Sequence, residues 1–354
     1  MPDIVSTSKI TFDHLTPQSE LKEFAINVFG KNFKDIDRLI TSFDNALIET
    51  RNLSVPVSYF ADNKPFSEKN KKYIEYALKY SVKAINASLL KSGINKDDIT
   101  DIIFISTTGL STPSIDALII NEMRLNENIN RWPVWGLGCA GGTAGIAKAN
   151  VIAKADPDAV VMVVALELCS LTFVMNDMSK SNFIATGLFS DGAAAVLVTG
   201  DNFENKNKED VSVRIIDSHS RMYYDSLDIM GWDFLDEGFR VIFSRDIPTV
   251  VRDNVRNDVD VFLKRNDLNI SDIKNFVTHP GGTKVINAYM EALNVEPAKF
   301  NNTFETLKDY GNMSSATILY VLDRFFEKGF EKGHGLMISL GPGFSLELVL
   351  LEIK

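Results

Sequence analysis

The stretch GLGCAGGTAG, residues 136–145, decides how this chain is interpreted, because it fits two different folds and two different enzymes. Its glycines spell G-x-G-x-x-G, the pattern of a dinucleotide-binding turn, and Cys139 stands in the middle of that pattern. A dinucleotide fold also needs an acidic residue about 20 positions further on, at the end of the next strand. Glu167 comes too late in that strand to fit well. The dinucleotide interpretation is therefore the weaker one.

A nucleophilic cysteine explains more of the same stretch. A thiol at a helix N-terminus lies beside free backbone N–H groups and the positive end of the helix dipole, which favour the thiolate. The small residues around Cys139 would let a substrate approach closely, and those of the following helix allow tight burial. The alternative is that Cys139 is an ordinary small core residue, as a lone cysteine usually is.

The composition is that of an ordinary globular enzyme. The chain has 354 residues, 45% hydrophobic and 24% charged, with a formal net charge of −10 that argues against a nucleic-acid partner. Two cysteines give neither a disulfide framework nor zinc spacing, so we expect no metal. The longest strongly apolar run, residues 159–168, is too short to span a membrane, and the first residues lack an apolar signal core. These features predict a cytoplasmic protein.

The order of elements predicts a duplicated α/β unit. Residues 1–98 have mostly helical patterns, and each later half then gives a strand, a helix entered through small residues, and two strands. The polar segment 202–210 is the candidate boundary. We therefore predict an N-terminal half, residues 1–205, and a C-terminal half, residues 206–354. In this scheme Cys139 and Asn312 occupy equivalent places at helix starts.

His279 and Asn312 are the predicted partners of Cys139. His279 ends a strand directly before a Pro-Gly-Gly turn that would expose the ring in a cleft, and Asn312 lies in YGNMSS, before a buried helix. Together the three residues suit thioester chemistry: the cysteine takes the acyl group, while imidazole and amide N–H donors hold the thioester oxygen as it gains charge. Taken alone, a histidine at a strand end is more often structural.

Five segments then make a family recognisable. GCAGGTAGI, LFSDGAAAVLV, HPGG, YGNMSSATILYVLD and LGPGFSLELVLL, in this order and spacing, resemble the chalcone synthase-like type III polyketide synthases over roughly residues 10–354. A further segment, DSLDIMGWDFLDEGFRVIFSRDIP, resembles the bacterial branch of that family. The resemblance implies the α/β thiolase fold, with two pseudo-symmetric βαβαβαββ halves in a five-layered αβαβα arrangement. It also implies a homodimer.

The same resemblance assigns roles to individual residues. Cys139, His279 and Asn312 match the family's catalytic set, and Arg51 matches weakly a region that contacts CoA; a solvated surface arginine is the alternative. Two positions depart from the plant enzymes, since Trp232 stands where they have glycine and Val241 where they have a second gatekeeping phenylalanine. The expected substrate-binding residues are Phe189, Cys169, Thr107, Thr172, Trp232, Val241, Gly341, Pro342 and Gly343.

The implied reaction is an iterative decarboxylative condensation of malonyl-CoA onto an acyl-CoA starter, with release by cyclisation and no cofactor. The departures at the pocket favour a fatty acyl-CoA starter and an alkylpyrone or alkylresorcinol product. A malonyl-CoA-primed aromatic synthase is one alternative, and a ketoacyl-ACP synthase-like condensing enzyme is another. A catalytically dead scaffold on the same fold is disfavoured by the intact Cys-His-Asn set.

Overall fold

The computed structural model describes residues 1–30, 32–33, 36–203 and 211–354, and the predicted boundary at 205/206 lies outside them. The strands are β1 (Asp3–Lys9), β2 (His14–Pro17), β3 (Thr50–Leu53), β4 (Asp101–Ile105), β5 (Asn130–Val134), β6 (Val160–Leu168), β7 (Asp191–Thr199), β8 (Val213–Met222), β9 (Met230–Leu235), β10 (Gly238–Phe243), β11 (Ile273–Thr278), β12 (Gly333–Gly341) and β13 (Ser345–Ile353). The α-helices are α1 (Gln18–Phe29), α2 (Ile36–Asn45), α3 (Phe66–Ser92), α4 (Ile115–Met123), α5 (Gly141–Ala155), α6 (Lys180–Leu188), α7 (Ile247–Arg265), α8 (Thr283–Leu293), α9 (Asn301–Tyr310) and α10 (Thr317–Lys328).

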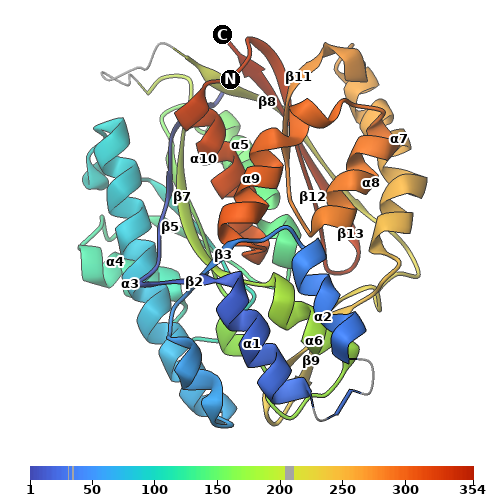
Figure 1. Cartoon of the computed structure of the whole chain (residues 1–354). Helices are drawn as coiled ribbons and strands as arrows, with labels where there is room; N and C mark the ends of the chain where they lie inside the picture. The colour runs from blue at the N-terminus through green and yellow to red at the C-terminus, as the bar shows by residue number, and fades with distance from the viewer. Residues whose placement is uncertain (31, 34–35, 204–210) are drawn as a thin grey trace.

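Nine of the described strands form one sheet, and their order reveals the duplication (Figure 1). The order is β11-β12-β13-β8-β1-β7-β6-β4-β5. On one side β4 pairs parallel with β6, which pairs antiparallel with β7, which pairs antiparallel with β1. The strands β11, β12, β13 and β8 repeat the same directions on the other side. Only β5 has no counterpart, since the fully described chain between α8 and α10 forms a helix where the first half has a strand.

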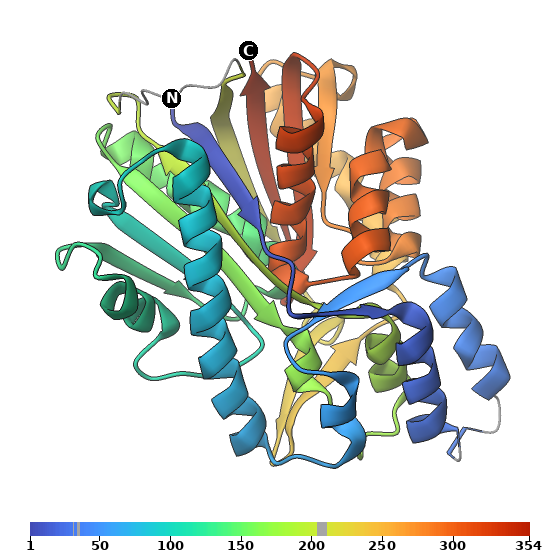
Figure 2. The same ribbon diagram turned by 60° about the vertical axis from the view of Figure 1, so that its left-hand side comes forward.

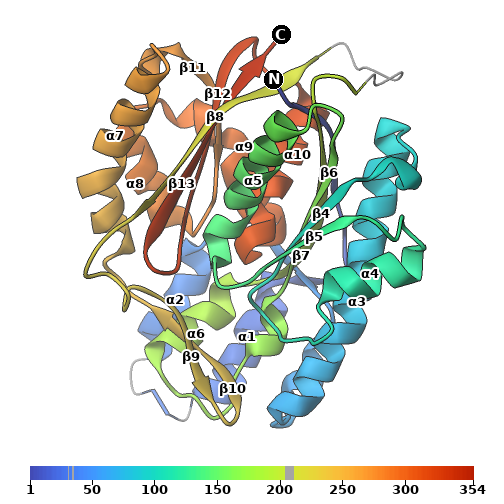
Figure 3. The same cartoon turned by 180° about the vertical axis from the view of Figure 1, so that it is seen from behind.

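Two helices lie between the halves and two further pairs cover the outside. Helix α5 contacts β6 and β13, and α10 contacts β7 and β11, so both touch strands of either half (Figure 3). Helices α3 and α4 cover the outer face of the first half, and α7 and α8 that of the second (Figures 1 and 2). Strand β6 is apolar apart from Glu167 because both of its faces are covered: Val161 and Val163 face the inner core, while Val160 and Met162 face α3. The expected five-layered α/β arrangement is confirmed.

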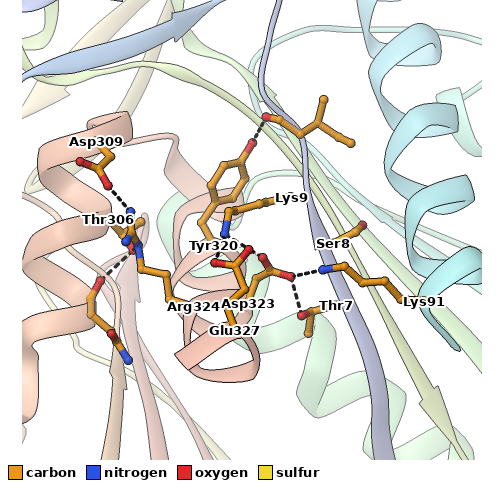
Figure 4. A network of polar contacts seen from close by, with 12 residues as sticks. Thr7, Ser8, Lys9, Lys91, Thr306, Asp309, Tyr320, Asp323, Arg324 and Glu327 are labelled. Atoms are coloured by element: carbon orange, nitrogen blue, oxygen red, sulfur yellow. Dashed lines mark hydrogen bonds and ion pairs between the residues drawn. The ribbon is translucent and has the colours of Figure 1, made fainter. Parts of the chain in front are cut away.

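The first 98 residues differ from our expectation of a mostly helical segment. Strand β1 lies in the middle of the sheet, between β7 and β8, and β2 and β3 form a separate antiparallel pair. A buried polar network secures β1 against α3 and α10 (Figure 4). Its centre is the Asp323 carboxylate, which accepts from Thr7 Oγ1 at 2.7 Å and lies 2.9 and 3.0 Å from the amines of Lys9 and Lys91. Most buried polar groups in proteins have such a partner, and here a carboxylate of the second half finds its partners in the first.

Candidate active site

Cys139 lies in η3 (Gly138–Ala140), a 3-10 turn that runs directly into α5. The turn begins at Gly138 with φ of 45°, and a Cβ at this position would lie 2.7 Å from Pro342 Cδ. Glycine is therefore needed for both the left-handed backbone and the space. The turn holds the thiol at the N-terminal end of α5, 4% exposed, with 3.8 Å between Cys139 Sγ and Ser314 Oγ.

The Gly341-Pro342-Gly343 loop at the end of β12 closes over this turn. A Cβ on Gly341 would lie 2.6 Å from Ala140 Cβ, and Gly343 has φ of 100°. The loop thus approaches the cysteine turn backbone to backbone, which only glycine allows. Contact of these three residues with substrate stays a prediction.

Asn312 connects the cysteine turn with the histidine. It follows α9 and precedes η7 (Ser314–Ala316), a 3-10 turn that enters α10 and packs against η3. Its Oδ1 accepts from the backbone N–H of Ser314 at 2.9 Å, and its Nδ2 donates to the carbonyl of Gly281 at 3.3 Å. Gly281 in turn donates its N–H to the carbonyl of His279 at 3.0 Å. The amide of Asn312 therefore fixes the turn that follows His279 relative to the turn beside Cys139.

His279 follows the end of β11, where its N–H donates to the carbonyl of Ile338 in β12 at 2.9 Å. The residue is 3% exposed, yet neither ring nitrogen has a hydrogen-bond partner among the described residues. A buried imidazole without partners is costly, so it is suited to receive its partner from a bound ligand.

Burial shifts the two titratable groups in opposite directions. It raises the pKa of Cys139 to about 12, although hydrogen bonds from Ser314 and Asn312 work against the rise. It lowers the pKa of His279 to about 3. Both shifts favour the neutral thiol and the neutral imidazole, whereas the position of Cys139 at a helix N-terminus led us to expect a thiolate. Proton transfer from the thiol would then accompany substrate attack instead of preceding it.

We expected Cys139 and Asn312 to occupy equivalent places in the two halves, but the two 3-10 turns show that they do not. Gly138 and Ser314 both have positive φ, 45° and 49°, and both begin the 3-10 turn that leads into an inner helix. The residue equivalent to Cys139 is therefore Ser315, and Asn312 lies ahead of the turn. The expectation was wrong because a helix pattern in sequence does not show where the turn before it begins.

Glu167 is a site residue that the sequence analysis considered only as a cofactor-binding acid. Its buried carboxylate accepts from Ser315 Oγ at 2.6 Å and from the N–H of Thr107 and Oγ1 of Thr108, both at 2.9 Å. Burial raises the pKa of Glu167 to about 7, against these hydrogen bonds. An acidic residue inside an otherwise apolar strand was the signal, since such a residue must have buried donors. Glu167 thus joins the turn of one half to the strand ends of the other.

Thr107 supports the cysteine turn. It does not line the cavity among α1, β3, α6 and the hairpin β9–β10 that contains other predicted residues. Its Oγ1 accepts from the N–H of Gly138 at 3.1 Å, and its own N–H donates to Glu167. Its predicted contact with substrate stays a prediction.

One cavity brings together six of the predicted residues. It lies among α1, β3, α6 and the hairpin β9–β10, and most of its wall is apolar. Phe189 connects the wall with Asn312, since these two residues form an isolated β-bridge. The predicted residues that line it are Arg51, Cys169, Thr172, Phe189, Trp232 and Val241.

Trp232 and Val241 are direct cross-strand partners in the β9–β10 hairpin. Side chains of directly opposite residues in an antiparallel pair share one face and touch. The Trp232 ring also packs on Phe239, with centroids 6.0 Å apart. The large side chain of Trp232 therefore lies next to the small side chain of Val241. Both departures from the plant enzymes thus change the pocket at the same place.

Arg51 is buried, so it is neither a solvated surface arginine nor a residue at a basic surface entrance for CoA. It is 1% exposed, and its Nη1 donates to the carbonyls of Thr186 and Phe189 at 2.6 and 2.9 Å. A contact with CoA stays a prediction, and it would have to be made from inside the cavity.

Comparisons with known proteins agree on one family. Residues 63–202 match the N-terminal domain of the chalcone and stilbene synthases, and residues 222–353 match their C-terminal domain. A Bacillus subtilis (strain 168) protein whose name places it among the chalcone synthases is 44% identical over 343 residues, 95% of this chain and 94% of that one. The 1,3,6,8-tetrahydroxynaphthalene synthase of Streptomyces peucetius subsp. caesius is 32% identical over 96% of this chain and 90% of its own length.

A solved structure shows the same architecture. The crystal structure of the Streptomyces coelicolor A3(2) 1,3,6,8-tetrahydroxynaphthalene synthase, a bacterial type III polyketide synthase, superposes with a TM-score of 0.93 at 27% identity, covering 99% of either chain. Within the described residues, the helices are all too short or too polar to cross a membrane.

Proposed function

We propose a specific reaction for this chain, which belongs to the chalcone and stilbene synthase family and is a type III polyketide synthase, an acyltransferase. A fatty acyl-CoA primes the enzyme, two or three malonyl-CoA units extend the chain, and cyclisation releases an alkylpyrone or an alkylresorcinol. We place the reaction in the cytoplasm, where CoA thioesters are available.

In the first step Cys139 Sγ attacks the carbonyl carbon of the starter thioester. The thiol proton passes to His279, whose free ring nitrogen supports this role, and CoA leaves as its thiol with that proton. In the second step malonyl-CoA loses CO2. His279 and Asn312 Nδ2 donate to the thioester oxygen, which holds the negative charge of the enolate. The enolate carbon then attacks the acyl group on Cys139 and displaces its thiolate, which forms a β-ketoacyl-CoA. The β-ketoacyl group then passes from CoA back to Cys139, with release of CoA, before the next extension.

The apolar wall of the cavity is the observation that carries the fatty acyl starter. Besides the predicted residues and the polar Ser170, Asn182 and Thr186, the wall is formed by aliphatic and aromatic side chains of α1, β3, α6, β10 and the neighbouring turns, which suit an alkyl chain. These additional apolar residues are Leu21, Phe24, Leu53, Phe60, Phe173, Ala185 and Phe239.

A malonyl-CoA-primed aromatic synthase is the second candidate. The Streptomyces peucetius relative is named for 1,3,6,8-tetrahydroxynaphthalene, a product with oxygens at the alternating positions that two-carbon units leave. Trp232 supports this candidate as well, because a filled pocket suits a compact ring.

The edge of the sheet supports the homodimer. Strand β5 is the last strand on its side and pairs only with β4 in the described sheet. Trp132 and Trp135 are each 47% exposed beside this edge, and unpaired strand edges with exposed apolar residues are favoured sites of association. We expect the two copies to meet here.

A starter panel tests the proposal. Purified enzyme is incubated with labelled malonyl-CoA and acyl-CoAs from C6 to C16, with coumaroyl-CoA, or with no starter, and products are identified by mass spectrometry. We expect alkylpyrones or alkylresorcinols from the fatty acyl series and none from the Cys139→Ala control. Efficient turnover of coumaroyl-CoA or malonyl-CoA alone, without use of the fatty acyl series, would contradict the starter assignment.

A further inference from the structure

Arg51 is the one charged residue in the described lining of the cavity. It stands in β3, and Nη1 holds two carbonyls at the end of α6, those of Thr186 and Phe189. These two hydrogen bonds use both protons of Nη1. The remaining donors of the guanidinium, on Nε and Nη2, have no hydrogen-bond partner among the described residues.

The unpaired atoms form one side of the guanidinium. Nε and Nη2 carry parallel N–H groups, the arrangement that binds two oxygens of one planar group at once. A buried donor without an acceptor destabilises the protein, and the effect is larger when the group is charged. A side chain that is 1% exposed cannot meet this need from bulk water. The free edge of Arg51 therefore carries two unused donors that match a pair of oxygens.

The charge of Arg51 is only partly balanced by the protein. Burial lowers its pKa to about 9, and the nearby Asp191 acts in the opposite direction. Asp191 makes no hydrogen bond to Arg51, because its oxygens accept from the N–H of Ser54 and from the N–H and Oγ of Ser170. Oxygens with partial negative charge at the free edge would be stabilised by this cation in an otherwise apolar space.

We propose that Arg51 binds the 1,3-diketone unit of the growing polyketide, donating from Nε and Nη2 to its two ketone oxygens. The inference rests on the proposed function and names the part of the intermediate that the cavity recognises. An alkyl starter carries no such oxygens, and each condensation adds one carbonyl two carbons from the last. Holding both oxygens on the same side bends the chain, so Arg51 would influence which ring forms.

The test separates the first extension from the second. Wild-type and Arg51→Lys enzymes are loaded with octanoyl-CoA, mixed with malonyl-CoA, quenched at intervals, and the acyl group on Cys139 is read by mass spectrometry. Lysine keeps the charge and can still donate to the α6 carbonyls, but it lacks the two parallel N–H groups. Arg252→Lys, at a half-exposed surface ion pair with Glu291, is the matched control.

We expect Arg51→Lys to load starter and to complete the first extension within about threefold of wild type. The second extension, whose product carries the 1,3-diketone, should slow by about tenfold or more, in line with charged hydrogen bonds of about 1.5–3 kcal/mol. Equal slowing of every step would mean a structural role and would overturn the inference. A raised KM for malonyl-CoA with both extensions slowed would assign Arg51 to the malonyl carboxylate instead.

A second measurement uses the wild-type enzyme and does not depend on how the variant folds. Tridecane-6,8-dione and tridecane-5,8-dione differ only in the spacing of their carbonyls. The 1,3-diketone should inhibit starter loading at about tenfold lower concentration than the 1,4-diketone. Equal inhibition would overturn the inference. If octanoyl-CoA is not accepted, the proposed starter fails, and the stepwise comparison is run with the starter that the panel identifies.

Discussion

The close approach of α5 to α10 yields the sharpest test of how the candidate active site is positioned. Gly142 stands in the first turn of α5, where an added Cβ would meet the carbonyl oxygen of Ser315 and lie 2.6 Å from Ile318 Cγ2. Ordinary contacts begin at 3.4 Å, so Gly142→Ala must push the start of α10 away by about 0.8 Å.

That displacement would act on the site through η7. Ser315 holds the carboxylate of Glu167, and Ser314 lies beside Cys139 and holds the amide of Asn312. A misplacement of about 1 Å can cost about 10²-fold in rate, whereas overpacking costs about 1–3 kcal/mol of stability. We therefore expect a folded Gly142→Ala enzyme whose kcat for condensation is about 100-fold lower.

Thermal unfolding and condensation kinetics are measured side by side. Gly231→Ala is the control, because a Cβ there meets nothing within 4 Å and its backbone is not in the left-handed region. It should keep wild-type kinetics within about twofold, as surface substitutions usually do. A Gly142→Ala enzyme with wild-type kcat would refute the idea that this helix contact sets the geometry of the site.

Three further predictions use other parts of the molecule. Burial alone would raise the pKa of Asp323, but hydrogen bonds from Thr7 and Lys9 and the charge of Lys91 outweigh burial and lower this pKa. The Asp323 carboxylate therefore stabilises the fold above about pH 4, and this stabilisation is lost as the pH falls. Asp323→Asn should cost about 3 kcal/mol in urea unfolding at pH 7 and progressively less below pH 4, while Asp260→Asn, at an exposed pair, should cost under about 0.5 kcal/mol. Trp232→Gly should shift the product profile in liquid chromatography towards longer polyketides or bulkier starters; an unchanged profile would rule out a role in size selection. After starter loading, mass spectrometry should find the acyl group on Cys139 only, and Cys169→Ala should keep condensing; an adduct on Cys169 would reverse the assignment.

The elements that sequence predicted well are those whose pattern comes from burial alone. Strands β6 and β7 and strands β12 and β13 are rich in apolar residues because both of their faces are covered, and such segments are visible without knowing the partner. The three predicted catalytic residues were chosen from the turns around them, and the structure joins those turns through the amide of Asn312.

Strand β1 shows why the rest could not be predicted. Three of its residues, Ser6, Thr7 and Ser8, are polar and buried, and their hydroxyls bond Ser88, Asp323 and Ala84. Their acceptors lie 76 to 316 positions away in the chain. A polar segment becomes a central strand only when α3 and α10 supply those partners, and nothing local indicates this.

The two 3-10 turns η3 and η7 are copies of one duplicated turn, yet their side chains make different contacts. Both begin at a residue with positive φ, but Gly138 must be glycine because Pro342 occupies the place of its Cβ, while Ser314 directs its side chain towards Cys139. The next residue is the thiol in one half and Ser315, bonded to Glu167, in the other. The turn η3 thus presents the predicted nucleophile, and the turn η7 is hydrogen-bonded through Ser315 to Glu167 at the end of β6. Because η7 is held by Glu167 and packs against η3, it gives the turn that carries Cys139 a rigid support. Such support is needed where a site must keep its geometry within about 0.5 Å.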